Sequence, residues 1–474
     1  MEKGANPMVS QNSSRGNSNF NTECAFGNAI KELKISQLLK ASNITKARGA
    51  SAYEVFQFLL IMVFQRCNLY HFLSSKKKDT ACDDNTYYRF LNEGRFNWKK
   101  FILLLSTRVA AYMSTLTSRD RVKCLVLDDS VIARNRAKKV ELLSTVFNHV
   151  IGKCERGFNL LLLGWTDGYS FLPVQYNMLA SAKQENRYNE AKTIHGSHRS
   201  NAYIRRQDAV ETKPEAALKL IKAALSTGIE ADYILMDTWF TTEPFIAKIK
   251  ELNLDTIGML KDCKQEYWYN GKLCKLKALA ARVNMSSTGE LFGSIVVKTK
   301  KQKLAVKLVF VRNRNKQSDY IVILSTDTTL ADSEIVRTYG NRWNIELCFR
   351  TCKSLLCLGS EYQGLNYDMT ESTTAIVLCR FIILEYLRRK NSDPKTICEL
   401  FYVCCDDIQD MDLTTALKSI MSIFAEGLKT GDIKISSAMS ARLLDWYVSQ
   451  PNFIKVLFPT FPEQLQGPEN QTAA

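Results

Sequence analysis

A stretch near residue 340, TYGNRWNIELCFRTCKSLL, places polar side chains at helical spacing. Tyr339, Arg342, Glu346 and Lys353 follow one another at offsets of 3, 4 and 7 residues. In an α-helix these side chains project within roughly 60° of one another, and Arg350 joins the same stripe. Most of the remaining circumference is apolar. We therefore expect a helix that is buried on most sides and leaves one narrow polar strip open to water or a ligand.

The polar strip contains one carboxylate among cations, which suits a metal ion held beside a phosphate. The alternative is a solvated stripe stabilised by a Glu346–Arg350 pair, worth about 0.3–0.5 kcal/mol. Cys348 and Cys352 lie on the opposite face of the helix. Because no second pair of ligands accompanies them, they indicate core packing and not zinc.

Length and charge restrict the class of partner. A chain of 474 residues is long enough for two or three domains, and 46% hydrophobic residues can build substantial cores. Lys and Arg number 64 against 48 Asp and Glu, which gives a formal charge of +16 and favours a polyanion such as nucleic acid. No apolar run reaches the ~18 residues of a membrane span, so no membrane partner is expected. The polar start lacks a signal peptide, which indicates a cytoplasmic protein.

The supply of metal-binding and nucleophilic side chains favours carboxylate chemistry. The 14 cysteines are scattered without a CxxC pair and are expected to be reduced, mostly buried residues. Only 4 histidines are present, which disfavours a histidine-dependent hydrolase or a zinc enzyme. Glycine-rich phosphate loops are missing as well, so nucleotide binding has no support.

The N-terminal part of the chain is expected to be helical. Residues 1–27 are predicted to be a disordered tail, and residues 28–118 a helical DNA-binding domain. Within it, Asp83 or Asp84 can cap a short helix carrying Tyr87 and Tyr88, which we place against a duplex. An ordinary helical bundle with solvated lysines is the alternative.

From residue 119 the pattern changes to an α/β domain. Three strands, VKCLVLDDS, GFNLLLLGWTDG and SFLPVQYNML, are followed by alternating helices and strands, and Asp167-Gly168 indicates a two-residue hairpin turn. These elements predict a mixed sheet flanked by helices over residues 119–390. A run of short strands at about 262–327 indicates an inserted β subdomain. Residues 391–474 are predicted to form a helical C-terminal region.

Two of the predicted strands end in acidic residues. Asp128 and Asp129 close LVLDDS, and Asp237 closes YILMD. Placed beside Glu346, they would bring three carboxylates together, and such oxygen ligands hold Mg²⁺ or Mn²⁺. Two such ions about 4 Å apart can activate an attacking oxygen and stabilise a leaving oxygen at phosphorus.

Asp129, Asp237 and Glu346, with Tyr339, Arg342 and Lys353 around the glutamate, resemble the DDE site of bacterial insertion-sequence transposases. The Tyr-Arg-Glu-Lys spacing is the signature of the insertion-sequence-four family, whose catalytic core is ribonuclease-H-like with a β insertion before the glutamate. The intervals fit: 237 − 129 = 108 and 346 − 237 = 109 residues. Family members place the first ligand before Thr or Ser. Because Ser130 follows Asp129, Asp129 is preferred to Asp128.

The resemblance implies cut-and-paste DNA transposition. Water activated at two Mg²⁺ (or Mn²⁺) ions bound by Asp129, Asp237 and Glu346 would nick each transposon end. The freed 3′ hydroxyl would then form a hairpin, and its reopening would free the end to join target DNA. The implied partners are the terminal inverted repeats and target DNA, bound by a homodimer in a synaptic complex. The implied location is the bacterial nucleoid.

The resemblance also suggests DNA-binding side chains. Arg342 and Lys353 would hold phosphates, and Tyr339 would donate a hydrogen bond to one. Trp268, in KQEYWYNGK, is the candidate platform for a flipped base, with Trp239 as the next choice. For Tyr339 and Trp268, packing roles are the alternatives.

Two basic segments were considered as further phosphate contacts. One is a loop, HGSHRSNAYIRR, which contains His195, His198, Arg199, Arg205 and Arg206. The other is an edge of the β insertion, with Lys298, Lys300, Lys301, Lys303, Lys307, Arg312 and Arg314, for which a solvated face is an equal alternative.

Two other functions remain open from the sequence. A ribonuclease-H-like nuclease without integration would use the same carboxylates, and the joining of labelled ends separates it from a transposase. A non-catalytic DNA-binding protein derived from a transposase would bind DNA in a salt-sensitive way without needing Mg²⁺.

Overall fold

The computed structural model describes residues 25–74, 82–118, 121–194, 197–261, 265–283, 289–313, 319–362, 364–391 and 394–408, and then 424, 427–428, 435–450, 455 and 461–465. The chain divides into two compact units, Met1–Phe401 and Tyr402–Ala474. Residues 1–24 of the expected N-terminal tail lie outside the described residues.

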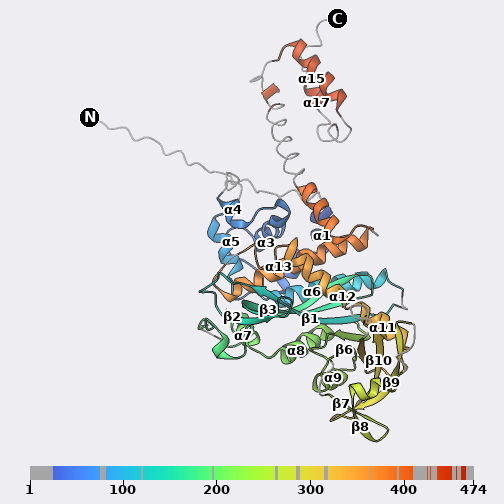
Figure 1. The fold of residues 1–474 in the computed structure, drawn as a ribbon. Coiled ribbons are helices and arrows are strands. Elements are labelled where there is room, and N and C mark those ends of the chain that lie inside the picture. Colours follow the sequence, from blue (N-terminus) through green and yellow to red (C-terminus); the bar gives the residue numbers. More distant parts are fainter. Residues whose placement is uncertain are drawn as a thin grey trace. The chain divides into compact units, whose positions relative to one another are not determined.

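One mixed sheet forms the centre of the first unit (Figure 1). In the described part of the chain it has eleven strands, in the order β2-β3-β1-β5-β6-β11-β10-β9-β7-β8, and β4 pairs with β3. β1, β5 and β6 run parallel, and the other pairs are antiparallel. The strands are β1 Cys124–Ala133, β2 Ser144–Asn148, β3 Lys153–Thr166, β4 Phe171–Leu179, β5 Tyr233–Met236, β6 Asp255–Leu260, β7 Glu266–Tyr269, β8 Lys272–Lys275, β9 Leu291–Thr299, β10 Ala305–Arg312 and β11 Tyr320–Ser325.

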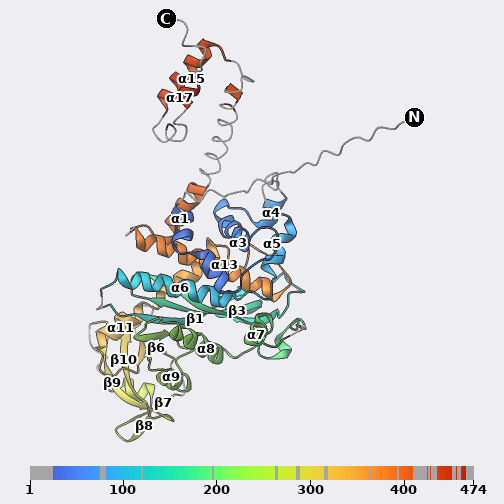
Figure 2. The same ribbon diagram turned by 180° about the vertical axis from the view of Figure 1, so that it is seen from behind.

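Helices cover both faces of this sheet (Figures 1 and 2). One face carries α6 (Trp98–Thr115), α12 (Trp343–Ser354) and α13 (Tyr367–Lys390), and the other carries α8 (Lys213–Ser226) and α9 (Glu243–Lys250). α8 begins at a capping interaction in which Thr212 and Glu215 hydrogen bond to each other, with Pro214 in the first turn. This mixed α/β arrangement is consistent with the expected ribonuclease-H-like core.

Helix α13 is buried along nearly its whole length, because the N-terminal helices pack on the side that the sheet leaves free. These helices are α1 (Ala25–Glu32), α2 (Ile35–Ala41), α3 (Ala52–Ile61), α4 (Leu69–Leu73) and α5 (Asp84–Leu91), with the short 3₁₀ helix η1 (Met62–Gln65). Arg380 of α13 is fully buried. It pairs with Glu361 at 2.5 Å and donates hydrogen bonds to the carbonyl oxygens of Leu59 and Leu60 at the end of α3.

The tyrosine-rich helix is α5, and Asp83 caps it through a hydrogen bond from the Asn85 N–H. Tyr87 is buried and packs against Phe58, with 4.5 Å between ring centroids. Tyr87 therefore belongs to the core and does not face a duplex, while Tyr88 is partly exposed.

Three local features differ from the sequence prediction. The β3–β4 turn has four residues, Asp167–Ser170, because the Asp167 side chain accepts hydrogen bonds from Tyr169 and Ser170 and Gly168 adopts a φ of 83°. Strand β2 was not predicted. The strands of the expected insertion do not stand apart, since β11 pairs with β6 and continues the main sheet.

The expected single helix around Tyr339 is two helices. α11 (Asp332–Gly340) ends just before Asn341, and α12 begins after Arg342. Between them the N–H groups of Asn341, Arg342, Asn344 and Ile345 each bond to the carbonyl three residues earlier. This tightened turn replaces the regular α-helical bonds but keeps the chain coiled, so the polar stripe survives.

In the second unit, the described residues include α15 (Ser437–Ser449) and α17 (Phe461–Leu465). Tyr447, Phe461 and Leu465 form its buried cluster. In the described part of the whole chain, we find no helix with the length and apolarity that a bilayer crossing requires.

Candidate active site

Three elements bring acidic side chains together. β1 carries Asp128 and Asp129, Asp237 follows β5, and Glu346 lies in the first turn of α12. β1 and β5 are parallel, and Leu127 pairs with Met236. The residues that follow this pair, Asp128 and Asp237, therefore lie at the same edge of the sheet. α12 packs against β1 from one face.

Arg342 joins the carboxylates. Its guanidinium donates to Asp128 Oδ2 at 3.2 Å and to Glu346 Oε1 at 2.5 Å. The expected alternative for the stripe, a Glu346–Arg350 pair, is therefore replaced by a Glu346–Arg342 pair, while Arg350 is exposed. Arg342 links β1 to α12 and neutralises part of the negative charge.

The charge at this site is not fully compensated. Burial and the nearby Asp237 carboxylate, against the opposing effect of Arg342, raise the pKa of Asp128 to about 7. Burial also raises the pKa of Asp237, although the N–H groups of Phe240 and Trp239 donate to its carboxylate and oppose this shift. The Asp129 carboxylate also raises the pKa of Asp237, and carboxylates that repel one another in this way favour an additional cation between them.

Asp129 has different surroundings. Successive strand residues point to opposite faces, and Asp129 Oδ2 accepts from Lys213 Nζ at 2.8 Å, at the start of α8. Lys213 also lies 4.9 Å from the centroid of the Trp239 ring. Lys213 is a neighbour of the site that sequence reasoning missed. Its only sequence signal was its place in Thr-Lys-Pro-Glu, a helix-start motif that precedes Asp237 in the chain.

Tyr339 and Lys353 complete the stripe. The Tyr339 hydroxyl is buried without a hydrogen bond of good geometry in the described structure, and its ring centroid lies 5.8 Å from Arg342 Cζ. Burial raises the Tyr339 pKa to about 12. Lys353 Nζ donates to Ser130 Oγ and to the Val131 carbonyl, both at 2.8 Å, and burial lowers its pKa. The four signature side chains therefore lie together beside β1.

The donor set suits a hard divalent cation, but the side chains are not in coordinating positions. Within the described ranges, no three His, Cys, Asp or Glu residues are placed to hold a metal ion. The Arg342 guanidinium lies between Asp128 and Glu346 and acts as the local cation. Oxygen donors with raised pKa values fit Mg²⁺ or Mn²⁺, provided that Arg342 moves aside.

The tryptophan predicted to support a flipped base lies in the β extension. Trp268 is half-buried, its Nε1 donates to the Lys300 carbonyl at 3.2 Å, and Lys303 Nζ lies 3.8 Å from its ring centroid. Trp239 is 43% exposed and lies two residues after Asp237, to which its N–H donates at 3.0 Å, so of these two indoles it is the one beside the carboxylates.

Part of the basic edge is internally paired. Lys300 pairs with Glu266 and Lys307 with Asp332, both at 2.7 Å. Lys298 and Lys301 are exposed, and Arg314 lies outside the described residues.

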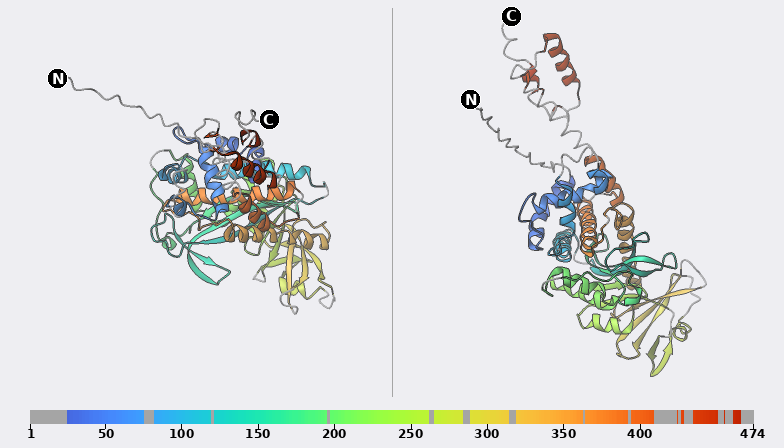
Figure 3. Two further views of the ribbon diagram at one scale, coloured as in Figure 1. Left: turned by 90° about the horizontal axis from the view of Figure 1, so that it is seen from above. Right: turned by 90° about the vertical axis from the view of Figure 1, so that its left-hand side faces the viewer.

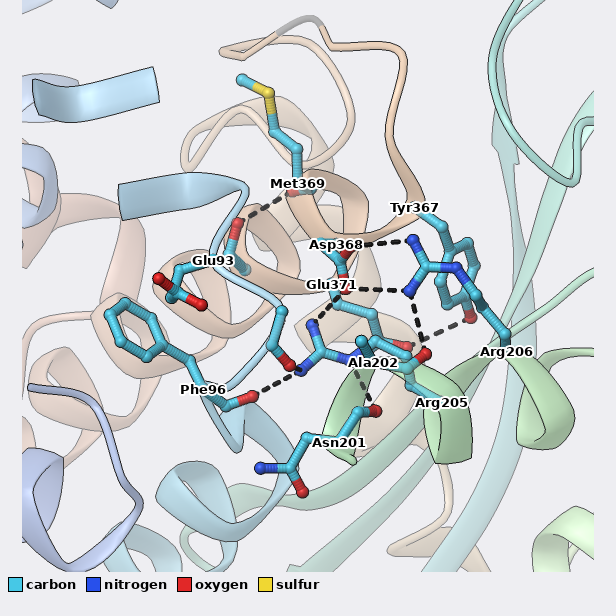
Figure 4. A network of polar contacts seen from close by, with 12 residues as sticks. Glu93, Phe96, Asn201, Ala202, Arg205, Arg206, Tyr367, Asp368, Met369 and Glu371 are labelled. Atoms are coloured by element: carbon cyan, nitrogen blue, oxygen red, sulfur yellow. Dashed lines mark hydrogen bonds and ion pairs between the residues drawn. The ribbon is translucent and has the colours of Figure 1, made fainter. Parts of the chain in front are cut away.

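The expected phosphate-binding loop is in part a buried helix. Arg205 and Arg206 belong to α7 (Asn201–Ala209) and are both buried (Figure 4). Arg206 pairs with Glu141 at 2.6 Å and with Asp368 at 2.7 Å, and Arg205 pairs with Asp368 at 2.9 Å. Both arginines are therefore structural, and the prediction that they contact phosphate is wrong. His198 stacks on Tyr203, and His195 lies outside the described residues.

Two family models match the chain. The model described as DDE superfamily endonuclease matches residues 59–269, which include Asp128, Asp129 and Asp237. The model described as transposase DDE domain matches residues 181–366, which include Asp237 and Glu346. No curated protein matches the chain. Residues 59–269 are therefore similar to DDE superfamily endonucleases, and residues 181–366 to transposase DDE domains.

Proposed function

We propose that this protein is a cut-and-paste transposase of the insertion-sequence-four family that cleaves transposon ends and joins them to target DNA. One observation carries the proposal: Asp128, Asp237, Glu346 and the Tyr-Arg-Glu-Lys side chains converge where β1, β5 and α12 meet. The two family matches together span all of these residues.

The contacts support Asp128 as the first metal ligand, in place of the Asp129 favoured by the sequence. Asp128 shares Arg342 with Glu346, whereas Asp129 pairs with Lys213. A bound pair of Mg²⁺ ions would supply an activated oxygen nucleophile and stabilise the leaving oxygen. Asp128, Asp237 and Glu346 would hold these ions.

The remaining side chains would bind and orient DNA. With metal ions held by the carboxylates, the guanidinium of Arg342 would be free to bind a phosphate oxygen. The Tyr339 hydroxyl can donate to the same phosphate, because it has no partner of good geometry among the described residues. Lys353, anchored on β1, would place a positive charge beside the scissile strand.

The partners in this proposal are transposon-end DNA and target DNA, with two copies of the chain in the synaptic complex. The N-terminal helices would contribute DNA contacts. Their packing on α13 would hold such contacts in a fixed position relative to the carboxylates.

Joining of labelled ends tests the proposal. The substrate is a duplex carrying the inverted repeat that flanks the gene, and the products are separated with and without Mg²⁺. We expect Mg²⁺-dependent nicking and joining, and both should be lost in Glu346→Gln. DNA binding should persist in this variant, because the affinity for DNA comes mainly from Lys and Arg side chains. Glu334→Gln, at an exposed carboxylate paired with Arg337, is the control that keeps activity.

Other products of this assay would contradict the proposal. Cleavage without joining, even from pre-cleaved ends, identifies a nuclease. DNA binding with no Mg²⁺-dependent product identifies a non-catalytic protein.

Trp268→Ala is expected to spare the first nick and slow hairpin formation. Loss of base stacking costs roughly 1–3 kcal/mol, and only the bent intermediate uses it. Nicked DNA should then accumulate on a gel that resolves nicked, hairpin and double-strand-broken ends. If Trp239→Ala produces this pattern and Trp268→Ala does not, the platform is the indole beside Asp237.

A further inference from the structure

The hairpin formed by β2 and β3 ends in exposed apolar side chains. Val150 is 94% exposed, Ile151 is 50% exposed, and Phe147 at the end of β2 is 47% exposed. The hairpin extends beyond the helices that cover the sheet (Figure 3). Within the chain these side chains gain little from burial, so a contiguous apolar tip of this kind indicates a binding surface.

The tip has a defined shape. Glu155 on β3 accepts hydrogen bonds from Asn148 at 2.6 Å and from Asn135 at 2.8 Å. The Val150 N–H donates to Asn148 Oδ1 at 3.0 Å, and Gly152 adopts a φ of 64° that favours glycine. The two aliphatic side chains are therefore presented without a large loss of conformational entropy on binding.

Exposed cations lie on the hairpin and on the segment that leads from β1 into it. Lys153 on the hairpin and Arg136, Lys138 and Lys139 after β1 are exposed. The neighbouring carboxylate of Glu155 already accepts from two amides. A second copy of this chain would bring the same cations against one another, whereas a polyanion complements them.

The polar stripe of α12 extends along β1 toward the base of the hairpin. Lys353 Nζ donates to the Val131 carbonyl, Val131 pairs with Asn159 of β3, and β3 begins in the hairpin. Hydrogen bonds from Asn148 and Asn135 lower the pKa of Glu155 on β3, and the positive charge of Lys353 contributes to the same shift. A duplex that passes the carboxylates beside Lys353 can therefore reach Val150 and Ile151.

We propose that Val150 and Ile151 form an apolar wedge that enters between base pairs of duplex DNA near the carboxylate cluster and bends it. The flanking lysines hold the phosphates on either side. Apolar side chains inserted at a base step unstack it and kink the duplex. This inference rests on the proposed function, and the duplex is transposon-end DNA, because the proposed first nick places that duplex at the carboxylates.

Fluorescence of 2-aminopurine tests the wedge, because unstacking of this base increases its emission. The probes are two short duplexes, one with the inverted repeat flanking the gene and one of unrelated sequence, each with 2-aminopurine moved through successive positions. The full chain is used in EDTA, so that binding is measured without cleavage. We expect a severalfold rise at one step of the inverted-repeat duplex and no rise on the unrelated duplex.

The double variant Val150→Ala/Ile151→Ala should lose this rise and weaken binding by about tenfold. Val448→Ala, at a 67% exposed valine of the second unit, is the matched control and should change neither signal. Lys138→Ala/Lys139→Ala should instead keep the rise and reduce the salt dependence of binding by about one phosphate contact per lysine.

An unchanged fluorescence rise in the Val150→Ala/Ile151→Ala variant would overturn the wedge. A shift in oligomeric state in that variant, with unstacking intact, would also overturn it and make the tip a contact between copies. Because EDTA separates unstacking from cleavage, absence of Mg²⁺-dependent products with normal unstacking counts against the proposed function alone.

Discussion

Replacing Asp128 by asparagine should abolish DNA cleavage, whereas Asp129→Asn should leave most of it. We expect Asp128→Asn to reduce the rate of the first nick by at least about 10³-fold, or ~4 kcal/mol of transition-state stabilisation. The amide keeps the size of the side chain but removes the negative charge shared with Asp237 and Glu346. Single-turnover nicking of end DNA in Mg²⁺ measures the effect.

Asp129→Asn is the matched control, because it changes the neighbouring residue in the same way. It weakens the pair with Lys213, so we expect a loss of less than about tenfold. DNA binding should persist in both variants. If Asp129→Asn abolishes nicking while Asp128→Asn retains it, the first ligand is Asp129, as the residue before Ser130 suggested.

Arg380→Met should lower the free energy of unfolding by about 3–5 kcal/mol. The change leaves Glu361 as an unpaired buried charge and removes the hydrogen-bond donors to the Leu59 and Leu60 carbonyls. Because these bonds join α13 to the end of α3, we expect the N-terminal helices and the sheet to be destabilised together. Urea unfolding followed by tryptophan fluorescence measures the change.

Lys390→Met provides the control on the same helix. Lys390 pairs with Glu32 at 2.7 Å, but both side chains are about 40% exposed, so its loss should cost about 0–1 kcal/mol. Adding Glu361→Met to Arg380→Met should recover part of the lost stability, because no unpaired charge remains. Equal losses for Arg380→Met and Lys390→Met would show that the buried pair does not hold these elements together.

Much of the sheet could be predicted from local patterns. Runs such as LVLDDS and YILMD are apolar, bounded by polar residues and long enough for strands, and they became β1 and β5. Strand β2 has only five residues with mixed burial, too short a pattern to recognise. The tightened turn between α11 and α12 has one weak local signal, Gly340 at the end of α11, because an isolated Gly inside a helical pattern is tolerated and does not by itself predict a break.

The sequence predicted which residues make up the candidate site better than it predicted how they are arranged. Helical spacing indicated that Tyr339, Arg342 and Glu346 share a face, and they do remain together. Arg205 and Arg206 were misread because a basic segment in a loop and one in a buried helix can have the same local sequence. Only the positions of Glu141 and Asp368, distant in the chain, show that these arginines are paired internally.

The sequence by itself determined the strands, the polar stripe and the residue types that support divalent-metal chemistry, because these depend on periodicity and on side-chain chemistry. The tertiary structure decided which partner each of two adjacent aspartates has. Asp128 and Asp129 have the same side chain and adjacent positions in the sequence. Because successive strand residues point to opposite faces, Asp128 contacts Arg342 and Asp129 contacts Lys213. That choice depends on which face α12 covers, a contact between segments more than 200 residues apart.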